Sequence, residues 1–440
     1  MSGFRTGLRA AVSAALLVSS SAGGALAQPA PPAAANGVLP GGVTYELRPD
    51  PAQAGAAISL WYRAPSSGFD GAPAPGLSRL AASTVAASAP ITGTPLGTLI
   101  AHWGGRISVA SYPDSVAITA LVPPDHAAQA VRAITAGYFA PVISAAGLQV
   151  AQREVGDDFI LRSLGPEAIE DALGAALFAS GPVHDGTLGT IQAVAELKLD
   201  RVRSFAERAF RPSNAILVLT GNVDAGVLSG VATRTGAATS PETPAAQVPQ
   251  ASPAPLRREA NIAGTGLGWV GPPITAEADA TALDFVADAL FARTGIVAKA
   301  LGTRKATVTG KFVTYRNPGV FLVTITGADA DAAVPIVQKA IADAAKPLSA
   351  PAFQAARAAF VYRILSDMAT PAELADTYGW YTVEGNPAYA PAEGGAQGRY
   401  LTVAAKLTPA AVAKTVAQYL GPAPAVVTVV RGSGPKATRS

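Results

Sequence analysis

Apolar and polar residues along the chain follow the same order of strand-like and helix-like patterns twice. Apolar residues alternate with others in short runs, as at residues 58–62 and 266–270, which predicts half-buried strands. Each run leads to a long Ala-rich helix with apolar residues at i, i+3 and i+4. Hairpin-like pairs follow at 106–110 with 115–122 and at 311–315 with 320–326, then helices, then closing strands at 215–220 and 425–430. Hairpins with helices grouped between them predict the α+β class.

The two halves match each other at an offset of 205 residues. Leu96-Gly97-Thr98 corresponds to Leu301-Gly302-Thr303, the run 116–122 to 321–327, and residues 143–149 to 348–354. A constant offset over three separate elements predicts an internal duplication. We therefore expect two duplicated domains, each a mostly antiparallel sheet covered by helices.

Two low-complexity segments divide the chain. Residues 28–36 form a Pro/Ala tether, and a run of the same composition at 237–255 has the character of an interdomain linker. We predict an N-terminal domain at 37–235, a linker at 236–257 and a C-terminal domain at 258–434.

The first 27 residues have the order of a secretory signal peptide. Arg5 and Arg9 lie before and at the start of an apolar run at 8–18, and the small residues end in Ala25-Leu26-Ala27. This apolar run is far shorter than the roughly 20 residues that span a bilayer, and no later segment reads as transmembrane. We expect cleavage after Ala27 and a periplasmic location.

Composition narrows the class of protein. The 440 residues are 49% hydrophobic and 14% charged and include no Cys, which excludes an acidic disordered chain, a disulfide scaffold and thiol chemistry. Loss of Arg5 and Arg9 with the signal peptide lowers the net charge from +3 to +1. So small and scattered a surplus does not predict a nucleic-acid or membrane surface.

Several ordered motifs resemble the pitrilysin/insulinase family of inverted zinc peptidases. The motifs are residues 42–45 (GVTY), Gly76-Leu77, Gly104-Gly105, residues 188–190 (LGT) and residues 211–214 (RPSN) followed by residues 217–224 (LVLTGNVD). Together they cover essentially the whole mature chain, and the last is the most specific. The resemblance implies an insulinase or mitochondrial processing peptidase-like fold.

The catalytic motif of that family is missing here. The resemblance places H-x-x-E-H on the helix that begins at Gly76-Leu77, where two His bind zinc and the Glu is the general base. In this chain Arg79 and Ser83 stand at the His positions and Ala82 at the Glu position, and no His precedes His102. A guanidinium cannot coordinate a cation and Ala cannot accept a proton. We expect no catalytic residue, no bound metal and no cofactor in this chain.

Two residues remain as substrate-contact candidates by the same resemblance. Glu154, with Asp157 and Asp158, occupies the region of the family's downstream carboxylate, although a solvated helix face is the plainer interpretation. Arg304 is near the position of the family's substrate-binding Arg, or is an ordinary helix-end cation. The expected Tyr near 308–309 is absent, and Tyr315 reads as a strand residue.

Other side chains give weaker signals. His102, His126 and His184 are not within helical reach of one another, and a site from two of them with Asp114 or Asp185 is a remote alternative. No G-x-S-x-G elbow is present. The aromatic residues Trp61, Trp103, Trp269, Trp380, Tyr378 and Tyr381 either line a peptide groove or, by default, pack in the core.

These features predict a catalytically inactive peptidase homologue. The resemblance implies a heterodimer with a zinc-bearing subunit of the same fold, which together enclose extended peptides. One alternative is a stand-alone peptide-binding or scaffold protein. Another is a metallopeptidase with a metal site rebuilt around Glu154 and Asp157.

Overall fold

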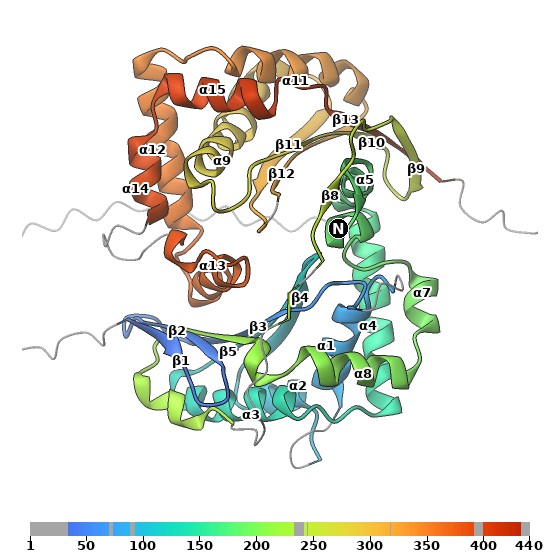
Figure 1. Ribbon diagram of the computed structural model, residues 1–440, viewed down its shortest axis with the longest axis vertical. Helices are drawn as coiled ribbons and strands as arrows, with labels where there is room; N and C mark the ends of the chain where they lie inside the picture. Colours follow the sequence, from blue (N-terminus) through green and yellow to red (C-terminus); the bar gives the residue numbers. More distant parts are fainter. Residues whose placement is uncertain are drawn as a thin grey trace, which may run out of the picture. The chain divides into compact units, whose positions relative to one another are not determined.

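The computed structural model describes residues 34–69, 74–88, 93–232, 242–243, 245–316, 318–390 and 399–432 (Figure 1). Residues 32–440 form one compact unit. The predicted signal peptide and tether residues 28–33 lie outside the described residues. Within the described part, no helix is long and apolar enough to cross a membrane.

Six strands form the sheet of the N-terminal half. They are β1 (Ala35–Val38), β2 (Thr44–Pro49), β3 (Ala56–Arg63), β4 (Arg106–Ser111), β5 (Ser115–Val122) and β7 (Ala215–Gly221). The order is β1-β2-β7-β3-β5-β4, and only β2 and β7 run parallel. Strand β1 begins inside the predicted tether.

Five strands form the second sheet, with the same topology. They are β9 (Leu256–Ala260), β10 (Gly264–Val270), β11 (Ala306–Val313), β12 (Val320–Gly327) and β13 (Ala425–Arg431). The order is β11-β12-β10-β13-β9, and only β13 and β9 run parallel. This is the order β4-β5-β3-β7-β2 of the first sheet, strand for strand. The predicted class, α+β with a mostly antiparallel sheet in each half, is confirmed.

Helices cover both sheets. The N-terminal half contains α1 (Leu77–Ala87), α2 (Leu96–His102), α3 (Ala127–Phe139), α4 (Ala145–Ser163), α5 (Glu167–Leu177), α6 (Pro182–Asp185), α7 (Ile191–Glu196) and α8 (Leu199–Ala209). The C-terminal half contains α9 (Glu277–Phe291), α10 (Ile296–Leu301), α11 (Ala330–Ala344), α12 (Ala350–Ser366), α13 (Pro371–Val383), α14 (Arg399–Lys406) and α15 (Pro409–Tyr419). The short strands β6 (Phe178–Ser180) and β8 (Val248–Pro249) pair with each other, β8 lying in the predicted linker.

The structure corrects two details of the sequence comparison. Strands β5 and β12, and helices α4 and α12, do begin 205 residues apart, at 115 and 320 and at 145 and 350. The Leu-Gly-Thr match is not an equivalence, because Leu96 begins α2 whereas Leu301 ends α10. Tyr315 is not a strand residue as predicted, because β11 ends at Val313. Tyr315 lies in the connection between β11 and β12, which also contains Pro318 and Gly319.

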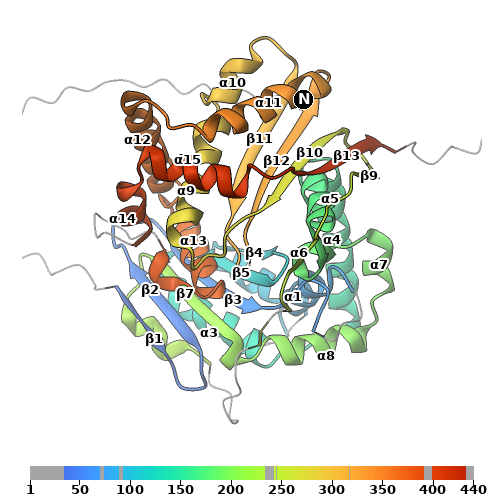
Figure 2. The ribbon, with the colours of Figure 1, turned by 45° about the horizontal axis from the view of Figure 1, so that its top comes forward.

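Each half contributes one helix to the sheet of the other half. Helix α5 buries Ile169, Leu173 and Leu177 in one cluster with residues of β12 and β13, and it packs along β10. Helix α13 buries Leu374, Ala375 and Tyr378 against β3, β5 and β7. Figures 1 and 2 show α13 over the first sheet and α5 beside β10 and β13. Since apolar burial is the main stabilising term in folding, this exchange fixes the two halves to each other.

Glycines make the room for both helices. In β10, Gly264, Gly266 and Gly268 lie under α5, and a Cβ at Gly266 would come 2.7 Å from the Ile169 side chain. On the first sheet the glycine is on the helix and the large side chain is on the strand. The indole of Trp61 on β3 lies directly against Gly379 on α13. A Cβ on Gly379 would overlap that indole.

Polar contacts join the same two halves. Lys311 pairs with Glu170 at 2.8 Å, and the Thr220 hydroxyl donates to the Pro371 carbonyl at 2.5 Å. Glu384, 2% exposed, accepts the Arg316 backbone N–H at 2.6 Å and lies beside Asp114. Burial raises the pKa of both carboxyl groups, and the charge of Asp114 raises that of Glu384 further.

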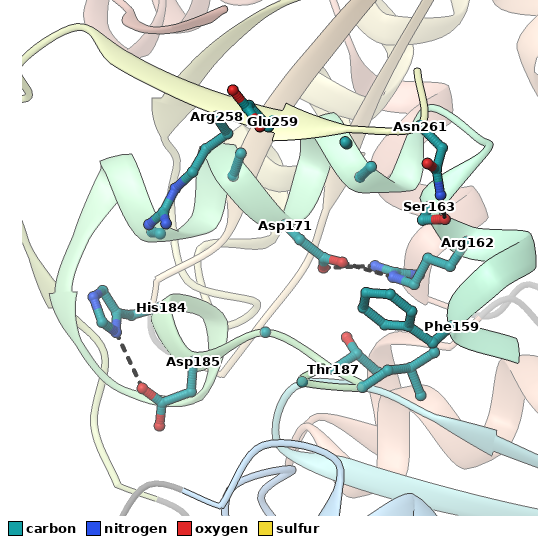
Figure 3. A pocket seen from close by; sticks show the side chains of 17 residues that line it. Phe159, Arg162, Ser163, Asp171, His184, Asp185, Thr187, Arg258, Glu259 and Asn261 are labelled. Carbon is teal, nitrogen blue, oxygen red and sulfur yellow. Dashed lines mark hydrogen bonds and ion pairs between the residues drawn. The ribbon is translucent and has the colours of Figure 1, made fainter. Parts of the chain in front are cut away.

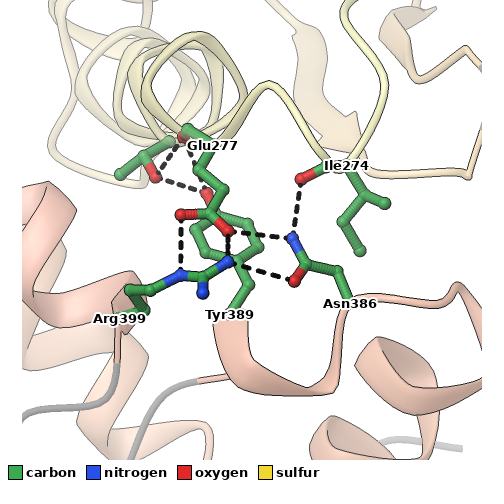
Figure 4. Close-up of polar contacts among 6 residues, drawn as sticks. Ile274, Glu277, Asn386, Tyr389 and Arg399 are labelled. Carbon is green, nitrogen blue, oxygen red and sulfur yellow. Dashed lines mark hydrogen bonds and ion pairs between the residues drawn. The ribbon is translucent and has the colours of Figure 1, made fainter.

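A polar network at the start of α9 joins this helix to later segments of the C-terminal half (Figure 4). Arg399 Nε and Asn386 Nδ2 donate to the Glu277 carboxylate at 2.9 and 3.0 Å, and the Tyr389 hydroxyl donates to the Glu277 carbonyl at 3.0 Å. Burial alone raises the pKa of Glu277, but these hydrogen bonds outweigh it and hold that pKa below its usual value. The network ties α9 to α14 and to residues 386–389.

The exchange predicts that Gly379→Ala destabilises the protein although Ala favours helices. The added methyl group must displace the Trp61 indole, and overpacking costs about 1–3 kcal/mol in the free energy of unfolding. Urea unfolding measures it. The matched control is Gly156→Ala on α4, where nothing lies within 4 Å of the added Cβ, so stability rises by about 0.5–1 kcal/mol. Equal effects of the two changes would contradict the account.

Candidate functional site

Helix α1 carries the positions at which the resemblance places zinc chemistry. It begins after Gly76, whose φ of 89° favours Gly and where a Cβ would collide with the Leu188 carbonyl oxygen. The helix packs on α4, so its first turns are buried. Arg79 is therefore held in the interior of the N-terminal half.

The Arg79 guanidinium joins α1 to α4. Its Nη2 lies 2.6 Å from Asp158 Oδ2, and its Nη1 donates to the Ser83 hydroxyl one turn further along α1. The Arg79 side chain is 10% exposed and that of Asp158 is 40% exposed. The structure thus brings together both degenerate His positions and a carboxylate from the predicted downstream region.

Ala82 is also part of this cluster. Its carbonyl accepts the hydroxyl of Tyr138 on α3 at 2.8 Å. Burial raises the pKa of Tyr138, so the hydroxyl stays protonated and acts as a donor. The methyl side chain of Ala82 cannot act as a base.

This set of side chains does not fit a zinc ion. The guanidinium is a permanent cation without a lone pair for a metal, and Ser83 and Asp158 are already its hydrogen-bond acceptors. Among the described residues, no group of three or more His, Cys, Asp or Glu side chains lies close enough to hold a metal ion. The alternative of a site rebuilt around Glu154 and Asp157 has no support in this geometry.

Glu154 and Asp157 lie on exposed parts of α4, and neither forms an ion pair with Arg79. Asp158 is the carboxylate that meets Arg79, and the sequence identified it only as one of three neighbouring acids. Spacing along α4 could not choose among them, because the choice depends on how α4 packs against α1.

The other predicted residues are dispersed. Arg304 is exposed and donates to the Leu301 carbonyl at the end of α10, at 3.1 Å, so its position is that of a helix-end cation. His126 stacks on Trp103, and His184 Nδ1 lies 3.0 Å from Asp185 Oδ1. His102 ends α2, and Asp114 lies at the junction of the halves beside Glu384.

The predicted aromatic residues are mostly in the interior. The residues Trp61, Trp269 and Tyr378 are buried, and Trp380 and Tyr381 are partly buried.

A cavity of about 480 Å³ lies next to the Arg79 cluster (Figure 3). Its lining includes the end of α4, the Ala-rich face of α5, residues 184–189 and residues 258–261 of β9 and its end. Phe159 in the lining follows Asp158 directly, and the loop Leu188–Gly189 contacts Pro75–Gly76 at the start of α1. The sequence gave no signal for this cavity, which three separate segments enclose.

The polar groups of this cavity are mostly paired. Arg162 binds Asp171 through two hydrogen bonds of 2.8 and 2.7 Å, and Asn261 donates to Ser163. Asp185 accepts from Ser67 at 2.7 Å and lies beside His184. Because Asp185, not His184, meets the serine, this is not the nucleophile-base order of acyl transfer. The cavity has apolar walls, from Phe159 and the alanines of α5, and a rim of polar groups, so it suits an apolar side chain.

Part of the chain matches a family of inactive peptidase domains. The family model described as "Peptidase M16 inactive domain" matches residues 196–360, less than half of the chain. No curated protein matches the sequence.

Solved structures resemble nearly the whole chain. A protease from Helicobacter pylori has a TM-score of 0.77 at 13% identity, with 91% of this chain and 99% of that one covered. A peptidase M16 inactive domain from Pseudomonas fluorescens has a TM-score of 0.71 at 17% identity, covering 90% and 97%. A chain of Complex III2 from Candida albicans, Inz-5 bound, has a TM-score of 0.71 at 13% identity, covering 90% and 94%. At these identities the likeness establishes the fold.

The Arg79–Asp158 pair predicts that Asp158→Ala destabilises the protein by about 1–3 kcal/mol. Removal of the carboxylate leaves a buried guanidinium unpaired, and the partial exposure of Asp158 keeps the cost below that of a fully buried pair. Adding Arg79→Met should restore much of the loss, which a double-mutant cycle by urea unfolding measures. Asp157→Ala, on the neighbouring exposed residue, is the control and should change stability by less than about 0.5 kcal/mol. Similar losses in both single variants would refute the pair's role.

The same cluster predicts that a metal site can be rebuilt. In a variant with Arg79→His, Ala82→Glu and Ser83→His, two imidazoles one turn apart face Asp158 and leave one zinc position open. After dialysis, metal analysis should find about one zinc per folded chain. Adding Asp158→Ala should remove most of it. A folded triple variant without zinc would show that these positions are not the lost metal site.

Proposed function

We propose that this chain, which has the fold of M16-like peptidases and matches the M16 inactive-domain model over residues 196–360, is the non-catalytic half of a peptide-enclosing chamber. A zinc-bearing subunit of the same fold supplies the other half. The partner performs the hydrolysis, and this chain closes the chamber around the peptide.

The observation that carries the proposal is the Arg79–Asp158 pair. An ion pair between α1 and α4 stands where the resemblance places the metal, and Ala82 stands where it places the base. The pair keeps the two helices cross-linked without metal, so the fold persists while hydrolysis by this chain does not. The family description, an inactive domain, supports the same assignment.

The fold retains surfaces that suit a peptide. Strands β4 and β11 are the last strands of their sheets, and exposed and less exposed residues alternate along both. An extended peptide can add to such an edge as a further strand and place alternate side chains against the protein. In the proposed chamber this subunit binds and orients the peptide and excludes water around it.

The predicted signal peptide places the proposed complex in the periplasm. The partner must then be exported as well. Metal remains confined to the partner in this proposal, because the Arg79 cluster offers no donor set for zinc.

A scaffold role without a peptidase partner is the second candidate. The likeness to a chain of Complex III2 favours it, because that protein shares this fold and belongs to an assembly. The two candidates differ in one respect, since only the first requires a zinc-bearing partner of the same fold.

Reconstitution tests the proposal. The purified mature chain is mixed with an exported same-fold protein that has an intact H-x-x-E-H motif, and cleavage of a quenched fluorescent peptide library is followed. We expect no cleavage by this chain, weak cleavage by the partner and at least about tenfold faster cleavage by the mixture, because enclosure positions the peptide and excludes water.

The control is the same partner with its motif Glu changed to Gln, which should abolish cleavage by the mixture. Unchanged rates on mixing, with no complex by size-exclusion chromatography, would favour the scaffold role. Zinc-dependent cleavage by this chain alone would overturn the assignment.

A further inference from the structure

A second cavity, of about 470 Å³, lies where the two halves meet. It shares Arg162, Asp171, Gly186 and Thr187 with the cavity of Figure 3, so the Arg162–Asp171 pair separates the two. Its other walls come from the turn after β4, from α5, from β11 and β12 and from α13. Every one of these elements takes part in the contact between the halves.

Three aromatic rings line this junction cavity. Trp380 on α13 has its ring centre 5.0 Å from that of Tyr112 and 5.6 Å from that of Tyr315. The Trp380 indole N–H donates to the Thr314 hydroxyl at 3.1 Å, which fixes the ring. Aromatic rings attract cations that lie over their faces, through the ring quadrupole.

Carboxylates outnumber cations in the lining. Four carboxyl groups, Glu167, Glu170, Asp171 and Asp376, face two cations, Arg162 and Lys311. Both cations are already engaged, Arg162 with Asp171 and Lys311 with Glu170. Among the described residues no cation pairs with Glu167 or Asp376. Glu167 lies in the first turn of α5, where the helix dipole stabilises its charge. The one hydrogen bond that the described residues give Asp376 comes from the Tyr112 hydroxyl at 2.9 Å, and burial raises the pKa of this carboxyl group, so a bound cation would stabilise its charged form.

Tyr315 adds a hydroxyl oxygen that can accept a hydrogen bond. Its side chain belongs to the lining and is only 7% exposed, and its hydroxyl has no hydrogen-bond partner among the described residues. Burial raises the pKa of Tyr315 well above its usual value, so the hydroxyl keeps its proton. This hydroxyl lines the cavity, and its oxygen can accept a hydrogen bond from a group bound there.

We propose that the junction cavity binds a cationic group, an alkylammonium or a guanidinium. Asp376 supplies the counter-charge, and the rings of Tyr112, Tyr315 and Trp380 form the walls. The group belongs either to a basic side chain of a peptide or to a free amine. The proposal concerns this chain alone and does not depend on a peptidase partner.

Titration of the full mature chain by calorimetry and Trp fluorescence tests this site. The probes are tetramethylammonium, N-acetylarginine amide and the neutral analogue N-acetylcitrulline amide. We expect Kd values of about 1 mM for the two cations, as for small fragments, and at least about tenfold weaker binding of the neutral analogue. Equal binding of the arginine and citrulline compounds would overturn the proposal.

Variants locate the binding. Asp376→Asn should weaken both cations about tenfold, the loss of one charge-assisted contact, while Trp380→Phe should weaken tetramethylammonium more than the arginine compound. The matched control is Asp200→Asn, on a carboxyl group that is 93% exposed on α8, and it should change nothing. Unfolding curves of each variant verify the fold. Unchanged affinity in a folded Asp376→Asn variant would place binding elsewhere and refute the site.

A peptide with one central Arg identifies the source of the cation. Binding at least about tenfold tighter than that of N-acetylarginine amide assigns the cavity to a peptide side chain, because flanking contacts add free energy. Equal affinity assigns it to a free amine. Both results require binding that Asp376→Asn weakens, and its absence refutes the site.

Discussion

The exchange of α5 and α13 is the constraint on which the rest of the structure depends. Each half places one helix on the sheet of the other. Strand β10 has glycine at positions 264, 266 and 268, where a Cβ would collide with side chains of α5. Neither sheet can bury its second face without the opposite half. The cavities, the Asp114–Glu384 pair and the aromatic junction all form along this contact, so they exist only in the assembled pair of halves.

The Arg79 cluster joins α1 to α4 at the positions where the resemblance places a metal. In the zinc peptidases that the chain resembles, the metal would link these two helices through its ligands. Here a guanidinium makes that link, with one hydrogen bond within α1 and one ion pair to α4. Arg suits the position because its charge is permanent and its planar group has several donors in fixed directions. The two helices are therefore held together by protein groups alone.

Much of the fold could be predicted from sequence, because it depends on local patterns. The alternation at 58–62 and the hairpin at 106–122 correspond to β3, β4 and β5, and the helix expected at Gly76-Leu77 is α1. What depends on packing could not. Three features could not be predicted: that Arg79 pairs with Asp158 and not with Glu154, that the halves exchange helices, and that two cavities form. Each depends on contacts between residues that are far apart in the sequence, from 79 residues for Arg79 and Asp158 to more than 200 for Tyr112 and Asp376. The Leu-Gly-Thr match failed for the same reason, since identical letters do not fix a position within a helix.

The central claim is that this chain is a metal-free half of a larger peptidase. Native mass spectrometry of the complex isolated with the full-length exported chain tests it most directly, because it gives subunit composition and metal content together. The account predicts a complex of this chain with a same-fold partner, in which zinc stays with the partner after gas-phase dissociation. Zinc bound to this chain, or its isolation only as a monomer or self-assembly, would contradict the account.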